Sequence, residues 1–520
     1  MIEYRKIWAN ARYEIITLLR GWFFRIFAGL SIVLFVALNI IWFSGAVPFV
    51  PRIFYGFSAA IPYANMILLN MIQIAVIIFM ASDFFKRDRK FNTAEVYYIR
   101  SMTNANYLLG KAMGVFILFM ILNLLILIIA LVIHLIFNDT SFNYIPYILY
   151  PVLLSFPSFV FIIGLSFILM QLLKNQAIVV LLLLGYYAGS LFFLYDVFYY
   201  IFDFVGFKIP FAYSDFVGLA NFKLVLFQRG LYFSLGIVFI LISILLFPRL
   251  SQSRRLKQII IGNLVVFSFI SIYSAISYLD FYSSRNQLRS KMMELNNRYS
   301  DQKDLTPLSC KIDFYHLGNS YRATTSYIFK NLADSDMDHY LFSINPGLQV
   351  EIVKQNNTNL QFTQENHIIN IKPGNSLQPG LIDSVQITYS GNINEAACYL
   401  DVEDYENQNS FGLWLFQSAR KHAFLNDNYI LLAPESMWYP RPGLPPGTNF
   451  LNRINRHFID YELEVHSKPN MIPLSQGSRE EISQGHFKFT PEYPLSDLTL
   501  IVGEYVEKSI MVDSINYELY

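Results

Sequence analysis

The segment YLLGKAMGVFILFMILNLLILIIALVIHLIF, residues 107–137, contains a single charged side chain, Lys111. A helix needs roughly 20 apolar residues to cross about 30 Å of hydrocarbon. In lipid the backbone has to hydrogen-bond within its own segment, so we expect a transmembrane helix here. Six more apolar runs occur in the first part of the chain. The predicted spans are residues 22–44, 58–82, 107–137, 147–173, 177–198, 231–248 and 258–279.

The chain as a whole is too apolar for a protein that lies entirely in water. Of its 520 residues, 54% are hydrophobic and 15% are charged, whereas a soluble domain has about 25% charged residues. Residues 1–280 carry 20 Lys and Arg against 10 Asp and Glu, and residues 281–520 carry 19 against 28, which gives +10 and −9. The two halves therefore differ chemically.

After residue 280 the sequence becomes polar and its periodicity changes. Leu288, Met292, Leu295 and Tyr299 have the spacing of one helix face. Short alternating runs separated by turn residues then predict an all-β domain. We expect an all-α membrane bundle at 1–280, a helical stalk at 281–305 and an extracytoplasmic all-β domain at 306–520.

The distribution of Lys and Arg predicts the orientation of the chain. Basic residues are frequent at the amino terminus and between the second and third spans, in residues 83–111. We expect both segments on the cytoplasmic side of a bacterial inner membrane. With seven spans, residues 281–520 are then periplasmic. The basic residues expected in outer segments are Arg52, Lys208, Lys223 and Arg229.

Uncharged polar side chains occur within the predicted spans. They are Asn65, Asn70, Gln73 and Asn123. Such side chains usually bond to a neighbouring helix, and the alternative is that they line a transport pathway. We expect no acidic or basic residue in the middle of a span, which favours an ATP-driven machine over a proton- or sodium-coupled carrier.

The segment between spans two and three has a specific pattern, RKFNTAEVYYIRSMTNANYLLGK at residues 89–111. With the amphipathic segment YRKIWANARYEIITLLRGW at residues 4–22, it resembles the ABC-2 type ABC transporter permeases, although that family has six spans. The resemblance implies a short coupling helix that binds a cytoplasmic ATPase. The residues at this contact would be Arg87, Arg89, Asn92, Thr93, Glu95, Arg100 and Lys111.

A simpler alternative is that these positive charges only hold the segment in the cytoplasm. The chain has no GxxxxGK[ST] motif, so ATP is expected on a separate ATPase subunit. The other expected partners are membrane lipid and a second permease or a second copy of this chain, and no nucleic acid.

The second half carries another resemblance. CKIDFYHLGNSYRATTSYIFKN at 310–331, VQITYSGNI at 385–393 and MWYP at 437–440 occur in this order. Together with the final strands they are similar to the amino-terminal β domain of the M1 zinc aminopeptidases. The resemblance implies that Glu435 could contact the amine of a substrate, and the simpler alternative is a turn residue.

Catalysis in that family needs two histidines one helical turn apart with a glutamate between them. None of the eight histidines has this HExxH spacing, and the GxMEN motif is also missing. We therefore expect no catalytic residues, metal or cofactor in this chain. Zinc would enter only with a catalytic peptidase chain supplied in trans.

The sequence leaves several alternatives open. Cys310 and Cys398 could form a disulfide, or both could be buried thiols. Tyr520 is either a natural end or marks a split from a catalytic half. The primary hypothesis is a permease subunit of an ATP-driven transporter of unknown substrate. The alternatives are the membrane-tethered part of a split zinc aminopeptidase and a complex that transmits mechanical work across the membrane.

Overall fold

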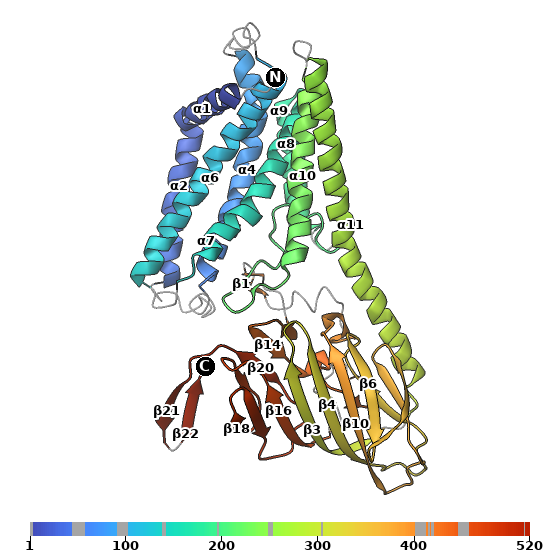
Figure 1. The fold of residues 1–520 in the computed structure, drawn as a ribbon. Helices are drawn as coiled ribbons and strands as arrows, with labels where there is room; N and C mark the ends of the chain where they lie inside the picture. The colour runs from blue at the N-terminus through green and yellow to red at the C-terminus, as the bar shows by residue number, and fades with distance from the viewer. Residues whose placement is uncertain are drawn as a thin grey trace. The chain divides into compact units, whose positions relative to one another are not determined.

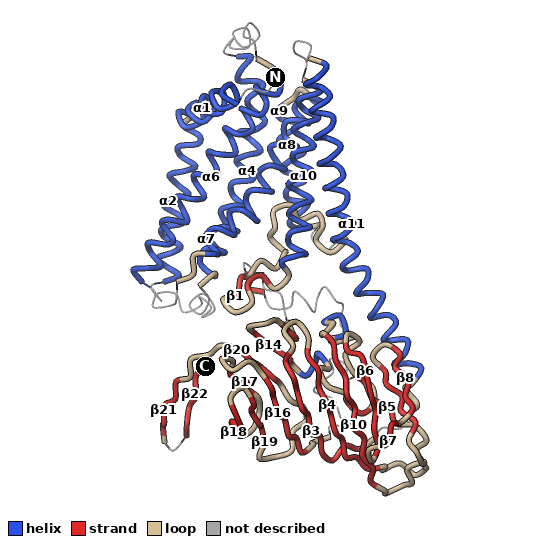
Figure 2. Tube along the Cα trace, in the orientation of Figure 1, coloured by secondary structure: helices blue, strands red, loops and turns tan. Residues whose placement is uncertain are grey.

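The computed structural model describes residues 4–43, 58–90, 102–137, 142–194, 197–247, 253–302, 305–400, 412–413, 416–417, 421–445, 457–513 and 515–520. The chain divides into two compact units. The first comprises Met1–Ser283 with Phe411–Ala419, and the second comprises Ser284–Ser410 with Arg420–Tyr520. The first unit is helical and the second is rich in strands, as Figures 1 and 2 show.

Apart from an amphipathic helix at the amino terminus, the helices of the chain follow the predicted apolar runs, and the last of them continues from the first unit into the second. They are α1 (Tyr4–Arg20), α2 (Trp22–Phe43), α4 (Ala60–Lys90), α6 (Asn104–Phe137), α7 (Ile145–Tyr150), α8 (Phe156–Leu173), α9 (Gln176–Phe192), α10 (Phe222–Leu246) and α11 (Arg254–Arg298). In the described part of the chain, six helical stretches are long and apolar enough to cross a membrane, with α7 and α8 counted as one. The predicted fifth span forms α9, which has 17 residues and is shorter than these.

Two local features of the bundle follow directly from the sequence. Between α7 and α8 the helix has a π-helical turn at Pro151–Ser155, as expected where a proline removes a backbone donor. The tight connection from α8 to α9 uses Lys174 in the left-handed conformation and Asn175 as N-cap. The Asn175 Oδ1 accepts hydrogen bonds from the amides of Ala177 and Ile178, which satisfies two free donors at the start of α9.

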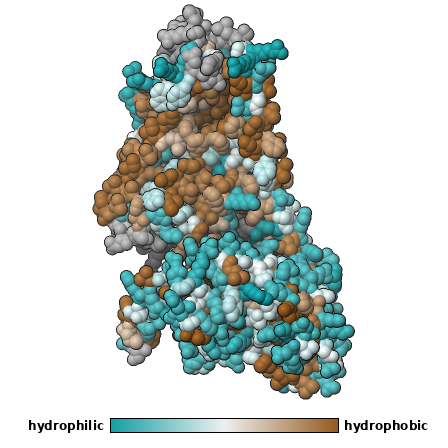
Figure 3. Space-filling view, viewed as in Figure 1, coloured by the Kyte–Doolittle hydropathy of each residue, from teal (hydrophilic) through white to brown (hydrophobic). Residues whose placement is uncertain are grey.

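Small residues allow α8 and α10 to pack closely. A Cβ atom added to Gly164 would lie 2.4 Å from the carbonyl oxygen of Gly236, and one added to Gly236 would lie 2.6 Å from the amide nitrogen of Phe161. Glycine is therefore required at both positions, as is common where membrane helices touch. On the face drawn in Figure 3, hydrophobic residues predominate on the helical unit, whereas the strand-rich unit is largely hydrophilic. This surface suits a lipid environment.

The second unit is built on an eight-stranded sheet with the order β18-β19-β16-β3-β4-β10-β6-β7. The pairs are antiparallel except for β16 and β3, which are parallel. The strands are β3 (Thr306–His316), β4 (Tyr321–Lys330), β6 (Leu348–Gln355), β7 (Thr358–Asn359), β10 (Ile382–Gly391), β16 (Asp460–His466), β18 (Ser478–Ser483) and β19 (His486–Thr490).

Two four-stranded sheets complete this unit, in the orders β13-β14-β20-β17 and β15-β5-β9-β8. Their strands are β13 (Ala423–Leu425), β14 (Tyr429–Leu432), β20 (Leu500–Gly503), β17 (Ile472–Leu474), β15 (Arg441–Pro442), β5 (Tyr340–Ser343), β9 (Ile368–Lys372) and β8 (Gln361–Glu365). In β4, buried residues alternate regularly with less buried ones, so the predicted period of two is confirmed. Trp438 and Tyr439 lie in the core, where the Trp438 indole donates to the carbonyl of Leu498 at 3.1 Å.

The last turns of α11 pack on the β domain within the second unit. Leu288 and Met292 contact Ala397 and Met437, so the predicted apolar face of the stalk is the packed face. Arg289 is buried, and its guanidinium donates to the carbonyls of Ala396 at 2.9 Å, Cys398 at 2.8 Å and Tyr399 at 2.6 Å. These bonds fix the helix to an irregular segment of the domain.

Both cysteines are buried, and no disulfide joins them, so the disulfide alternative is not realised. Burial raises the pKa of the Cys310 thiol to about 12, which keeps it protonated and unreactive.

Candidate coupling site

The amphipathic helix α1 packs along the first turns of α6. Its buried residues include Ile7, Asn10, Ala11, Glu14 and Leu18. Their spacing of three or four places them on one face of the helix. The amphipathic helix predicted at the amino terminus is therefore present, and its buried face contains two polar side chains.

Two glycines of α6 allow this contact. A Cβ atom on Gly110 would lie 2.4 Å from the Cβ of Asn10, and one on Gly114 would lie 2.6 Å from the Cβ of Glu14. Gly110 and Gly114 are one helical turn apart, as are Asn10 and Glu14. The two helices thus meet through a small-xxx-small surface, and any larger side chain there has to separate them.

A buried ion pair lies at the centre of the contact. The Lys111 ammonium is 2.7 Å from Glu14 Oε2, and the two side chains are 2% and 0% exposed. Asn10 adds a hydrogen bond from Nδ2 to the backbone carbonyl of Asn106 at 3.1 Å. Removing one partner of a buried pair strands a charge in a poorly polar environment, so this contact holds α1 firmly on α6.

The structure places only some of the residues predicted to bind an ATPase. Arg87 and Arg89 belong to the last turn of α4, and their side chains lie outside the described part. The positions of Asn92, Thr93, Glu95 and Arg100 also lie outside the described residues. Lys111 is described, and its ammonium contacts Glu14 rather than an exposed surface. The ion-pair partner was not expected, because no pattern in the sequence links residue 14 to residue 111.

The amides of the predicted spans form contacts between elements of the bundle. Asn65 and Asn39 exchange two side-chain hydrogen bonds of 2.8 and 2.9 Å between α4 and α2. Asn70 donates to the carbonyl of Val205 at 2.9 Å, and Gln73 donates to that of Phe119 at 3.4 Å.

For Asn123 the recorded contact is within its own helix, at 3.9 Å from the sulfur of Met120. The amide oxygens of Asn70, Gln73 and Asn123 are buried without a partner among the described atoms. Asn65 and Gln73 bond to neighbouring helices, whereas Asn70 bonds to the connection between α9 and α10. The pathway-lining role remains a hypothesis.

Arg229 differs from its expected place in an outer segment. Helix α10 begins at Phe222, before the predicted start at residue 231, so Arg229 lies within an apolar helix and is only 2% exposed. Its guanidinium donates to the carbonyl of Phe204 at 2.7 Å and to the Ser158 hydroxyl at 3.1 Å. The predicted start of this span at residue 231 is therefore too late, and Arg229 belongs to the first half of α10. The apolar residues on both sides of Arg229 are the signal that indicates a longer helix.

Asp203 supplies the negative charge near this arginine. The two groups attract each other, and the Asp203 carboxylate also accepts from the amides of Gly206 at 2.9 Å and Lys208 at 2.7 Å. Asp203 and Arg229 are both tied to backbone groups, which favours a structural role in holding the connection between α9 and α10.

Glu435 lies in a 3-10 turn, Pro434–Ser436, and accepts a hydrogen bond from the Tyr399 hydroxyl at 3.0 Å. The turn-residue alternative for Glu435 is consistent with this geometry. The second unit contains a compact group that the sequence analysis did not predict. It consists of Glu464, His466 and His486.

Comparison with known proteins gives structural similarity alone. No family model matches the chain, and no curated protein matches it. An M1 zinc metallopeptidase from Deinococcus radiodurans, solved as a mutant bound to a Tyr-Ser-Ala substrate, is similar at 12% identity and a TM-score of 0.31, over 42% of this chain and 47% of that one. Another structure of an M1 zinc metallopeptidase from Deinococcus radiodurans gives 12% identity and a TM-score of 0.30, over 40% and 44%.

The chain thus spans less than half the length of these structures. Their activity and substrates are properties of those proteins. Within its described residues, this chain has a helical part with six candidate membrane spans, followed by a β-rich domain.

Proposed function

We propose that this chain is the membrane subunit of an ATP-driven transporter and that a separate cytoplasmic ATPase binds residues 83–111. The observation that carries the proposal is the contact between α1 and α6. Residues 91–103 connect α4 to α6, and α6 is joined to α1 by the Glu14–Lys111 pair within its first turns.

This arrangement suits mechanical coupling. A load on the connecting segment passes to α4 at one end and to α6 at the other, and α1 moves with α6 because their contact is close and buried. We expect α1 and α6, which are linked in this way, to move as one body. The small residues between α8 and α10 allow α8 to slide along α10 while the two helices stay packed. The proposed motor supplies ATP hydrolysis, since the chain itself has no phosphate-binding motif.

The test is co-purification of the ATPase with the full-length chain. The double variant Arg87→Ala, Glu95→Ala should lose the ATPase and remain inserted in the membrane, because it removes two charges of the proposed contact and no apolar surface. Lys372→Ala, an exposed lysine of β9, is the matched control and should retain the ATPase. Retention of the ATPase by the double variant would contradict the proposed binding segment.

A second candidate function is to transmit mechanical work across the membrane without transporting a substrate. Helix α11 has 45 residues in one piece, and its final turns are fixed to the β domain by Arg289. At 1.5 Å per residue this helix is about 68 Å long, more than twice the hydrocarbon thickness of about 30 Å. A transmission complex needs such a continuous element.

A split zinc aminopeptidase is a third candidate, and one hairpin favours it. Strands β21 (Lys508–Val512) and β22 (Ile515–Leu519) are exposed on both faces. Ile510, Met511 and Tyr517 are more than half exposed, whereas an isolated two-stranded hairpin is marginally stable in water. An additional chain that covers this hairpin would supply the catalytic half. An M1-type peptidase that co-purifies and detaches on deletion of residues 508–519 would support this candidate over the transporter.

A further inference from the structure

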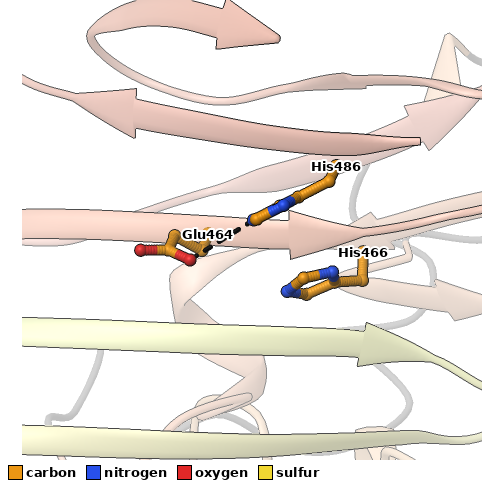
Figure 4. A group of neighbouring side chains, drawn as sticks. All are labelled: Glu464, His466 and His486. Carbon is orange, nitrogen blue, oxygen red and sulfur yellow. Dashed lines mark hydrogen bonds and ion pairs between the residues drawn. The ribbon is translucent and has the colours of Figure 1, made fainter. Parts of the chain in front are cut away.

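Two histidines and a glutamate meet on one face of the large sheet of the second unit (Figure 4). Glu464 and His466 are two residues apart on β16, so their side chains lie on the same face. His486 begins β19 and is directly opposite His466 in the antiparallel register. One ligand atom from each of the three residues lies within 4.8 Å of the other two.

The spacing of these atoms matches a metal site. The His486 Nε2 is 3.3 Å from Glu464 Oε2, which is longer than an ordinary N–H···O hydrogen bond of 2.7–3.2 Å. Two ligands of one tetrahedral zinc, at bond lengths near 2.1 Å, are about 3.4 Å apart. The observed separation therefore needs almost no movement to hold a zinc ion between the two atoms.

Asp313 orients the second histidine. Its Oδ1 is 3.0 Å from His466 Nε2, and because an ionised carboxylate only accepts hydrogen bonds, this nitrogen carries the proton. The lone pair is then on Nδ1, the other ring nitrogen. A carboxylate behind a metal-binding histidine is the usual outer-shell arrangement in metal sites.

The imidazole rings are held in place by stacking. Tyr315 lies 4.1 Å from His466 and His466 lies 4.0 Å from His486, between ring centroids, with interplanar angles of 2° and 22°. The three rings come from the adjacent strands β3, β16 and β19. Stacked rings direct their in-plane lone pairs side by side, so one imidazole has to turn out of the stack for both histidines to bind one ion.

The surrounding charges favour a cation. Asp313, Glu462 and Glu464 carry three negative charges, and Lys311 and Lys488 carry two positive ones, so the group with neutral histidines has a net charge of −1. Lys311 lies 3.0 Å from Glu464 Oε1, which leaves Oε2 for the ion. The side chains of His466, His486 and Glu464 are 28%, 22% and 21% exposed, so an ion can reach them from solvent.

We propose that Glu464, His466 and His486 form a binding site for a divalent transition metal, with Zn²⁺ as the ion that fits best. Two imidazoles and one carboxylate are the ligands of zinc sites that keep an open fourth position. Imidazole ligands favour zinc, copper and nickel over magnesium and calcium, which prefer oxygen. A bound ion joins β19 to β16 by bonds stronger than the cross-strand contacts alone.

The site is independent of the proposed transport function, so the test uses the full-length chain without an ATPase. The protein is purified in detergent without a polyhistidine tag, treated with a chelator and dialysed against a small excess of Zn²⁺. Bound zinc is measured by elemental analysis, and Co²⁺ in place of Zn²⁺ reports the ligand geometry through its visible absorption. Circular dichroism of each variant verifies that the sheet is folded.

The wild-type chain should retain about one zinc per chain, and His486→Gln and Glu464→Gln should each weaken binding at least tenfold. Asp313→Asn should weaken binding by about 10- to 100-fold, because it acts through His466. His339→Gln, at an exposed histidine away from the group, is the control and should bind like the wild type. Equal zinc retention in folded His486→Gln, or no retention by the folded wild type, would overturn the proposal.

Discussion

Neutralising one member of the Glu14–Lys111 pair should release α1 from α6. Both side chains are almost completely buried, so Glu14→Gln leaves the Lys111 charge in the interior without this carboxylate. Breaking a buried pair in this way costs about 3 to 5 kcal/mol. At 1.36 kcal/mol per tenfold change, the equilibrium constant for opening of α1 should increase by roughly two to nearly four orders of magnitude.

Amide hydrogen exchange of the full-length protein in detergent measures this opening directly, since it reports the local free energy of each segment. Peptides that cover residues 4–20 should lose protection in Glu14→Gln and in Lys111→Met, whereas peptides of β3 and β4 should not change. The double variant Glu14→Leu, Lys111→Met should recover most of the protection, because replacing both charges by apolar groups is often neutral. Arg12→Gln, at an exposed position of α1, is the control.

The reasoning would be refuted by single variants that keep the wild-type protection of α1. It would also be refuted if the double variant lost as much protection as both single variants combined, since the two charges would then act independently.

Three more outcomes follow from the structure. Gly114→Leu should push α1 away from α6 and so lower the yield of cross-links between these two helices. Gly262 has open space around it, so Gly262→Ala should leave that yield unchanged. Burial lowers the pKa of His367 from 6.5 to about 4. The unfolded chain therefore takes up this proton more readily than the folded one, so the free energy of unfolding of the second unit is highest above pH 6.5 and falls as the pH drops towards 4. At pH 5 the loss is about 2 kcal/mol, measured by unfolding of the second unit, and His367→Gln should remove this pH dependence. Arg289→Ala leaves three carbonyls without their donor and should cost about 3 kcal/mol in hydrogen-exchange protection of the stalk.

The element types were predictable because they depend on local pattern. Apolar runs of about 20 residues gave the spans, and alternation gave the strands of the second unit. The stalk face of Leu288 and Met292 was predictable for the same reason, since helical spacing is visible within one turn or two.

The partners of individual side chains were not predictable, because they depend on contacts between distant segments. Glu14 meets Lys111 only when α1 folds back on α6. His466 meets His486 only through the register of β16 and β19. The helix α10 begins earlier than the charge pattern predicts, because one backbone carbonyl and one hydroxyl accept the hydrogen bonds of Arg229 inside the bundle.

The central claim is that a separate ATPase drives this membrane subunit through residues 83–111. Affinity purification of the full-length chain from native membranes, followed by mass spectrometry of every stably bound protein, tests it most directly. We expect an ATPase with a phosphate-binding loop in the complex with the wild type and its loss from the Arg87→Ala, Glu95→Ala variant. An intact, membrane-inserted complex that contains no ATPase would contradict the claim.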